Sequence, residues 1–261
     1  MKDSVRLERS SWALCALLLL AWLLHWRTFG LEELGQDGYL SVDLGLGSLG
    51  EMLRYVARDV HPPLFFALLH GMFALGGRAY PVAKLLPIAA AQLSLVLIYR
   101  LVRQLAGSAA AWWATVLLLL SVPFLLLAPT VRPFTLGLCC SLLSLLLVVR
   151  WRAPPERHVR QRQVVLALVT AAALLSWYLQ LFVLVLEALL CWRGRQRSGD
   201  HPAATSAGIG SRGLVALAGG VLLAAPLYAF VLPGLLAKMR QGITVTEGTP
   251  ALPSATTVLA G

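Results

Sequence analysis

Residues 27–63 read RTFGLEELGQDGYLSVDLGLGSLGEMLRYVARDVHPP and form the longest polar interval that precedes the C-terminal region. The rest of the chain consists mostly of apolar blocks. Half of the 12 Asp and Glu residues lie in this one stretch: Glu32, Glu33, Asp37, Asp43, Glu51 and Asp59. We therefore expect the chemistry of the protein in this acidic loop, between two apolar segments.

The composition of the chain indicates a membrane protein. Hydrophobic residues make up 58% of it and charged residues 13%, with a mean hydropathy of +0.75. A soluble domain has about a quarter charged residues. Several apolar blocks have the length of about 17–25 residues that a helix needs to cross a bilayer. The sequence predicts an all-α fold, a polytopic transmembrane helical bundle.

The net charge of +10 is interpreted as a topology signal. The Lys and Arg residues lie mostly in short connections between apolar blocks, and cytoplasmic loops of membrane proteins collect such residues. A nucleic-acid surface would instead interleave basic and aromatic residues on a polar face. The four cysteines all fall in apolar segments without metal-ligand spacing, which favours small buried side chains over a disulfide or zinc site: Cys15, Cys139, Cys140 and Cys191.

About seven apolar segments follow one another along the chain: 12–26, 63–76, 80–99, 109–127, 134–149, 164–192 with a polar interruption at 176–180, and 213–232. The first is interpreted as an uncleaved helix with its N-terminus inside, which places the 27–63 loop on the outer or lumenal side. The whole chain, 1–261, is expected to be a single integral-membrane domain. Lys84 and Pro87 are expected to interrupt the segment at 80–99.

The 27–63 loop contains one predicted helix. Leu49, Met52, Leu53 and Val56 recur at helical spacing, which predicts a short amphipathic helix lying in the membrane interface. Glu51 and Arg54 are expected to pair at i,i+3 on its wet face. Four glycines are expected to break the chain before this helix: Gly35, Gly38, Gly45 and Gly47.

The basic loops at 100–103, 150–163 and 193–197 favour a common side of the membrane. That arrangement requires a hairpin over 109–149 with Arg132 at its outer tip and a chain reversal at 176–180. It also requires that one of the two segments between residues 63 and 99 does not cross fully. Simple alternation of seven helices would place two basic loops outside, so we prefer the charge-guided arrangement.

Several motifs resemble those of a known family. Asp37-Gly-Tyr, Leu49-Gly-Glu-Met-Leu and the run HPPLFFALLH at 61–70 resemble the first outer loop and second helix of GT-C glycosyltransferases, in the protein O-mannosyltransferase-like and aminoarabinose-transferase-like branch. Further matching positions extend the resemblance over most of 12–190: Lys84-Leu, Tyr99 to Arg103, Gly107, Arg132-Pro-Phe and Tyr178. The sequence differs from the family pattern in having Gly38 after Asp37, Thr130-Val131 before Arg132, and Trp177 before Tyr178. It is also shorter than usual, lacking the later helices of the family.

The resemblance implies transfer of a sugar from a polyprenyl-phosphate donor to a protein, glycan or lipid acceptor at the outer or lumenal membrane face. It implies that Asp37 is the catalytic base, and Asp43 is the second candidate carboxylate. Either carboxylate is also explained as a solvated turn residue, since Asp-Gly is a common turn pair. No metal ligand is assigned, and a divalent metal near the leaving phosphate is left open.

Four cations are candidates for binding the donor phosphate: His61, Lys84, Arg132 and Arg58. Each has a structural alternative. His61 also suits a turn cap, Lys84 a side chain that snorkels to the interface, Arg132 a topology charge, and Arg58 a contact with lipid headgroups. Tyr39, Tyr178 and Gln180 are expected to line the substrate cavity, although polar packing between helices explains Tyr178 and Gln180 equally well. His70 is expected to be a packed, hydrogen-bonded histidine.

Two other functions compete with the glycosyltransferase. The polar interruption at 176–180 and the intramembrane Lys84 suit a transporter or lipid flippase, although the sequence shows no matching pair of interrupted segments. A truncated, non-catalytic relative is the other alternative. The membrane is either a bacterial inner membrane or that of the endoplasmic reticulum. The predicted partners are the sugar donor, the acceptor and the membrane lipids, and no nucleic acid is expected to bind.

Overall fold

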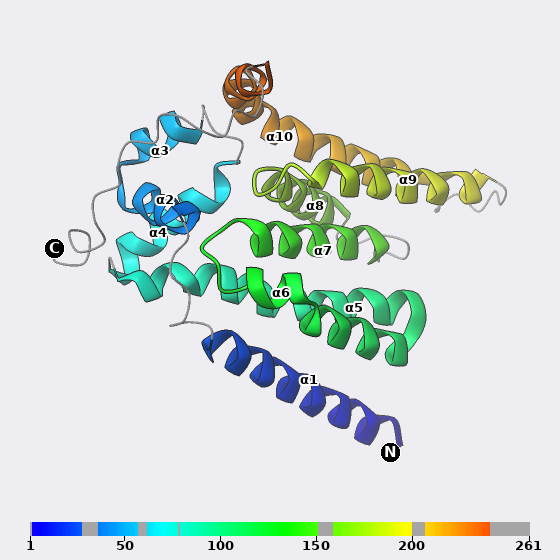
Figure 1. Ribbon diagram of the computed structural model, residues 1–261. Helices are drawn as coiled ribbons and strands as arrows, with labels where there is room; N and C mark the ends of the chain where they lie inside the picture. The colour runs from blue at the N-terminus through cyan, green and yellow to red at the C-terminus, as the bar shows by residue number, and fades with distance from the viewer. Residues whose placement is uncertain are drawn as a thin grey trace.

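The computed structural model describes residues 2–27, 36–56, 62–77, 79–150, 159–199 and 207–240, and the regular structure of these residues is helical. Figure 1 shows long helices stacked side by side, with a group of shorter helices at one end. The helices are α1 (Lys2–Arg27), α2 (Gln36–Leu46), α3 (Leu49–Val56), α4 (Leu64–Gly76), α5 (Tyr80–Leu120), α6 (Val122–Leu127), α7 (Phe134–Arg150), α8 (Val159–Leu174), α9 (Gln180–Gly199) and α10 (Ala207–Arg240). The all-helical part of the predicted fold is confirmed.

Helix α5 is a hairpin of two arms. Gly107 adopts φ 87° and ψ 178°, a conformation that interrupts the helix and that glycine tolerates without steric cost. In a straight helix Tyr99 and Trp112 would lie about 20 Å apart along the axis. Their ring centroids are instead 5.1 Å apart, so the arms on either side of Gly107 pack against each other. The arms correspond to the predicted apolar segments at 80–99 and 109–127.

The expected interruption of the first arm at Pro87 is wrong, because α5 continues through this residue. A proline in a helix removes one backbone donor and leaves a carbonyl one turn earlier without its partner. The carbonyl affected is that of Ala83. The Pro87 carbonyl itself accepts a hydrogen bond of 3.0 Å from Thr135 Oγ1, which joins α7 to α5 at this point. The side chain of Thr135 is buried in the α5–α7 contact.

Small residues allow the helices of the second half to approach closely. Helix α10 packs on α8 and α9, and α7 packs on α5 and α8. A Cβ added at Gly220 of α10 would lie 2.7 Å from the Ala167 carbonyl oxygen and 2.7 Å from Thr170 Cβ on α8. Close backbone approach at small residues is the usual way in which membrane helices associate.

The outward face of α9 is apolar and exposed. Phe182 is 75% exposed, Val185 60% and Leu189 55%, and these residues recur at helical spacing. Among the described residues, two helical stretches are long and apolar enough to cross a membrane, Pro81–Leu120 and Gly210–Ala229. The first of these contains the Gly107 reversal. The expected number of about seven membrane segments is therefore not confirmed.

The stretch that precedes α3 is helical, in contrast to the prediction. Gly38 and Gly45 were expected to break the chain, yet both lie inside α2. A Cβ at Gly45 would lie 2.8 Å from Phe73 Cε2 and 2.9 Å from Leu69 Cγ of α4. The absence of a side chain at Gly45 therefore serves the contact between two helices, which outweighs its low helix propensity.

Helix α3 matches the predicted amphipathic helix, and its residues Met52 and Val56 are each 1% exposed. The predicted pairing of Glu51 with Arg54 is not what holds its first turn. Ser48 Oγ and the Ser48 backbone N–H donate to Glu51 Oε2 at 2.8 and 3.0 Å, while the Glu51 N–H donates to Ser48 Oγ at 3.2 Å. This is a capping box, in which two end groups of a helix satisfy each other. Arg54 Nε instead donates to the Gly50 carbonyl at 3.2 Å.

The ends of the helices fall into two groups. Helix α8 ends at Leu174 and α9 begins at Gln180, so the chain reverses across the predicted interruption. In Figure 1 this turn, the turn before α7 and helices α2–α4 lie toward one end of the bundle, while the Gly107 bend and the last turns of α7 and α9 lie toward the other. The exposed arginines near that second end include Arg103, Arg150 and Arg193. These three arginines thus lie toward one end of the bundle, and the charge-guided membrane topology stays a prediction.

Candidate functional site

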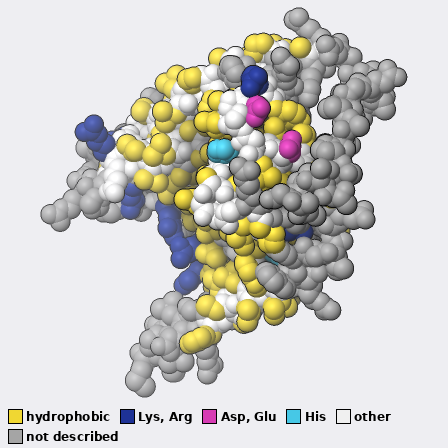
Figure 2. Space-filling model, turned by 90° about the vertical axis from the view of Figure 1, so that its left-hand side faces the viewer, with side chains coloured by type: hydrophobic (Ala, Val, Ile, Leu, Met, Phe, Trp, Pro, Cys, Tyr) yellow, Lys and Arg dark blue, Asp and Glu magenta, His cyan; other side chains and the backbone are white. Residues whose placement is uncertain are grey.

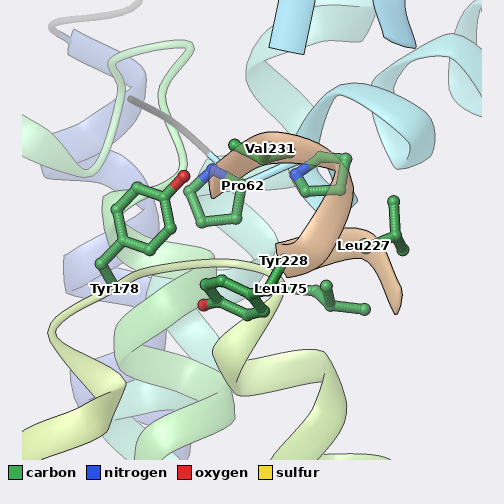
Figure 3. Close-up of a pocket in the computed structure, with 7 residues that line it drawn as sticks. Pro62, Leu175, Tyr178, Leu227, Tyr228 and Val231 are labelled. Carbon is green, nitrogen blue, oxygen red and sulfur yellow. The ribbon is translucent and has the colours of Figure 1, made fainter. Parts of the chain in front are cut away.

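A small pocket lies at the end of the bundle that carries α2–α4. The space between its walls is about 180 Å³, part of which is open to solvent, and seven residues line it: Pro62, Pro63, Leu175, Tyr178, Leu227, Tyr228 and Val231. Figure 3 shows how the start of α4, the turn between α8 and α9, and the second half of α10 surround it. Apart from the two phenol hydroxyls, its walls consist of apolar side chains.

The predicted HPP run and the predicted polar interruption meet at this pocket. The N–H of Leu64, the first residue of α4, donates a hydrogen bond of 3.0 Å to the Leu175 carbonyl. Pro62 and Pro63 lack backbone donors, which suits the start of a helix where such donors have no intrahelical acceptor. The two segments are more than a hundred residues apart in the sequence, and this bond joins them at the rim of the pocket.

Two tyrosines form one wall of the pocket. The Tyr178 and Tyr228 ring centroids are 5.7 Å apart. Tyr228 Oη donates a hydrogen bond of 2.6 Å to the Leu174 carbonyl, which is one of the last carbonyls of α8 and lacks an intrahelical partner. In Figure 3 the Tyr178 hydroxyl is directed toward Pro62, whereas the Tyr228 hydroxyl turns away from it. Tyr178 therefore lines this pocket, and its place in a substrate cavity stays a prediction.

Arg132 lies on a stack of aromatic rings beside this turn. Its guanidinium carbon is 5.9 Å from the centroid of the Phe134 ring, within the range of a cation–π interaction. The Phe134 ring in turn packs edge-on against Trp177 at 6.0 Å. Trp177 seats in a notch at Gly137, where an added Cβ would lie 2.8 Å from Trp177 Cβ. Arg132, half-buried, is thus linked through Phe134 and Trp177 to the residue next to Tyr178.

The two candidate carboxylates lie on α2. Asp37 is the second residue of that helix, and its side chain is outside the part of the chain that the structure describes. Asp43 is exposed one and a half turns later. Figure 2, which looks onto this end of the bundle, shows acidic side chains on a surface that is otherwise largely hydrophobic. Tyr39, predicted to line the cavity, is 37% exposed and does not line the pocket at Tyr178.

The acidic surface also contains the cap of α3. Hydrogen bonds from Ser48 hold the pKa of the Glu51 carboxyl below its ordinary value. Glu51 is therefore ionised at neutral pH and occupied with capping. His70 behaves as predicted, because its Nδ1 lies 3.0 Å from the Gly45 carbonyl and ties α4 to α2.

The predicted phosphate-binding cations are distributed unevenly. Arg58 and His61 lie outside the described residues. Lys84 is fully buried in α5 and has an interaction partner. The alternative that Lys84 snorkels to the interface is therefore wrong, since its ammonium lies inside the protein. Arg132 does not line the pocket, but Phe134 and Trp177 link it to the turn that carries Tyr178.

Gln180 was also predicted to line the cavity. It is 1% exposed, and the Ser141 hydroxyl of α7 donates a hydrogen bond to its Oε1. Gln180 is not among the residues that line the pocket. Its observed environment is the polar packing between helices that the sequence left as the alternative.

Sequence reasoning missed Tyr228, which lies in the last apolar segment. Tyr228 is a single tyrosine two residues after Pro226, inside a block of aliphatic residues, and no sequence motif distinguishes it as a site residue. Among the described residues, no group of three or more His, Cys, Asp or Glu side chains is placed to hold a metal ion. That finding does not bear on the side chains of Asp37 and its undescribed neighbours.

The comparisons with known proteins point to one family. A family model with the description dolichyl-phosphate-mannose-protein mannosyltransferase matches residues 60–210. No curated protein and no solved structure matches the chain. The matched residues include Pro62, Arg132 and Tyr178, whereas α2 precedes the matched region and Tyr228 follows it.

Proposed function

The chain belongs to the dolichyl-phosphate-mannose-protein mannosyltransferase family, and from this premise we propose that it transfers a sugar from a polyprenyl-phosphate donor to an acceptor at the outer or lumenal membrane face. The family is one of membrane glycosyltransferases of the GT-C type. Its description favours mannose as the sugar and a protein hydroxyl as the acceptor.

The observation that carries the proposal is the match over 60–210 together with what those residues build. Within that range lie Pro62 and Tyr178 at the pocket, and Arg132, which Phe134 and Trp177 link to the turn that carries Tyr178. An apolar pocket with phenol rings suits the isoprenoid units of the donor next to its phosphate. A guanidinium held over an aromatic ring suits the phosphate itself, because arginine binds phosphate oxygens through a fork of donors.

The reaction requires few protein groups. The acceptor hydroxyl oxygen attacks the anomeric carbon, the bond from that carbon to the phosphate oxygen breaks, and the phosphate leaves with both electrons of that bond. Asp37 accepts the hydroxyl proton as general base. Arg132 stabilises the negative charge that develops on the leaving phosphate. Lys84, Arg58 and His61 are supporting groups of the same proposed site, and Asp43 is the alternative candidate for the base.

We also propose that the chain crosses the membrane several times, as expected for an integral membrane protein of this family. The antiparallel run of α7, α8 and α9 in Figure 1 supports this arrangement. So does the exposed apolar face of α9, because 75% exposure of a Phe such as Phe182 is costly in water and favourable in lipid. Short helix α4 remains at the outer end with α2 and α3 in this arrangement.

The test of the proposal is a transfer assay with the full chain in liposomes. Radiolabelled mannosyl-phosphoryl-polyprenol is the donor, and a Ser/Thr-rich peptide is the acceptor. We expect Asp37→Asn to reduce transfer at least 100-fold, because the amide keeps the shape of the carboxylate and cannot accept the proton. Asp43→Asn, on the same helix and exposed, is the matched control and is expected to retain most of the activity.

Each outcome has a consequence for the assignment. Full activity of Asp37→Asn would refute the role of Asp37 while leaving the function intact. Loss in Asp43→Asn alone would move the base to that residue. Absence of transfer by the wild-type chain, with label remaining on the donor and donor bound, would refute the glycosyltransferase itself.

A further inference from the structure

A carboxyl group that the proposed reaction does not use lies inside the bundle. Glu187 is on α9, two turns after Gln180, and is 0% exposed. Two hydroxyls from other helices share its surroundings, Ser144 of α7 and Thr170 of α8, and both are also 0% exposed. The Ser144 Oγ and Thr170 Oγ1 atoms are 3.4 Å apart. Helices α7, α8 and α9 thus each contribute one polar side chain to the same interior.

The carboxyl of Glu187 has little to support a negative charge. Ser144 interacts with it, yet neither carboxyl oxygen has a hydrogen-bond partner of good geometry among the described residues. Of the ionisable side chains of α10 that the structure describes, Arg212 is exposed and the Tyr228 hydroxyl donates to Leu174 on α8. On α9 itself, Cys191 is one turn further on and is uncharged as a thiol, while Arg193 is exposed.

Physical chemistry decides which form of the carboxyl this environment accepts. An ionised carboxylate in a dry interior without a partner costs many kcal/mol, and such groups neutralise instead. A protonated carboxyl has one O–H donor, and a serine hydroxyl accepts such a bond while its own proton remains free for a further acceptor. The Ser144–Thr170 pair provides that acceptor and continues the chain of hydrogen bonds to α8.

We propose that Glu187 is a proton-binding site in the interior of the bundle: its carboxyl is protonated at neutral pH and donates a hydrogen bond to Ser144, which connects α9 to α7 and α8. The site is separate from the pocket at Tyr178 and does not depend on the proposed function. The ligand is a single proton, since Ser144 and Thr170 are neutral and bring no second charge to hold a metal ion.

Infrared spectroscopy of the full chain in a detergent without ester carbonyl groups, whose absorption would overlap the band sought, tests the proposal directly. A protonated carboxylic acid has a carbonyl stretch that ionised carboxylates lack. We expect this band at pH 7 in the wild type and its loss in Glu187→Gln, which is isosteric with the protonated acid. Glu51→Gln is the matched control, because Glu51 is exposed and ionised, and its removal should leave the band unchanged. A wild-type spectrum without the band at pH 7, or a band that survives Glu187→Gln, would overturn the proposal.

A second variant keeps the test independent of the folding of Glu187→Gln. Ser144→Ala removes the proposed acceptor and leaves the carboxyl in place, so we expect the band to remain and to shift in frequency. An unshifted band would show that Ser144 does not accept the proton of Glu187. Loss of the band in Ser144→Ala would show that the proton is not retained in the dry interior, and it would overturn the proposal as well.

Discussion

The contact between α2 and α4 at Gly45 allows a quantitative prediction. Substitution of Gly45 by Ala places a methyl group 2.8 Å from Phe73 Cε2 and 2.9 Å from Leu69 Cγ. Carbon atoms in favourable contact are about 3.5–4.0 Å apart, so α2 and α4 must separate by roughly 1 Å or the two side chains must leave their positions. The first change also lengthens the bond between His70 Nδ1 and the Gly45 carbonyl, now 3.0 Å.

The magnitude follows from two opposing effects. Overpacking a buried contact costs about 1–3 kcal/mol, and replacing a helical glycine by alanine stabilises the helix by about 0.5–1 kcal/mol. Gly50 on α3 provides the matched control, because a Cβ there meets nothing within 4 Å. The helix gain is common to both variants. The difference in the free energy of unfolding between Gly45→Ala and Gly50→Ala therefore isolates the clash, at about 1–3 kcal/mol.

Both variants are to be unfolded with denaturant in detergent micelles, with tryptophan fluorescence as the signal, and assayed for sugar transfer. We expect Gly50→Ala to be at least as stable as the wild type and fully active. Gly45→Ala should be less stable and at least tenfold less active, because a displacement of about 1 Å in the helix that carries the proposed base, Asp37, is costly. Equal stability of the two variants would refute the packing role of Gly45. A lower free energy of unfolding with an unchanged rate of sugar transfer would show that the position of α2 does not affect catalysis.

Two further predictions concern local hydrogen bonds. Glu51 has a lowered pKa, so its contribution to the stability of α3 is present above the ordinary carboxyl pKa and is lost as the pH falls through the lower folded value. Circular dichroism should show this acid-dependent loss of helix in the wild type. The same loss, unchanged, in a Ser48→Ala variant would contradict the capping box. Tyr228→Phe removes the bond of 2.6 Å to the Leu174 carbonyl and leaves that carbonyl buried. It should lower the free energy of unfolding by about 1–3 kcal/mol, and a thermal melt identical to that of the wild type would show that the bond contributes nothing.

Much of the fold was predictable because apolar length and helical spacing respond to strong forces. The amphipathic spacing at 49–56 predicts α3 correctly, and the polar interruption near Tyr178 predicts the reversal between α8 and α9. The prediction failed at Gly45, where glycine was interpreted as a chain breaker. There a contact with α4, distant in sequence, gives the glycine its role, and no local pattern contains that information. The capping box at Ser48 was visible as a Ser-x-x-Glu spacing, but the charge pair with Arg54 was preferred.

The candidate site was predictable only in part, because a pocket is a property of segments that meet in three dimensions. Tyr178 was predicted to line the substrate cavity from the polar interruption and the family resemblance. It lines the observed pocket, and its contact with a substrate stays a prediction. Tyr228 was not identified, since a lone tyrosine among aliphatic residues has no distinctive spacing. Lys84 shows the opposite case: a cation in an apolar segment was recognised as unusual, and whether it reached the interface or the interior depended on which neighbours surrounded it.

The Gly107 bend determines how the sidedness of the chain is to be counted. An apolar stretch of 40 residues, Pro81–Leu120, has the appearance of one continuous rod. If it is counted as one transmembrane helix, it crosses the membrane once. Every later loop is then assigned to the side of the membrane opposite to the one that a two-helix hairpin would give. In the membrane arrangement that we propose, the reversal at Gly107 gives this stretch an even number of traverses, which places Arg103 and Arg150 in the same compartment. One backbone torsion thereby sets the parity of everything that follows it.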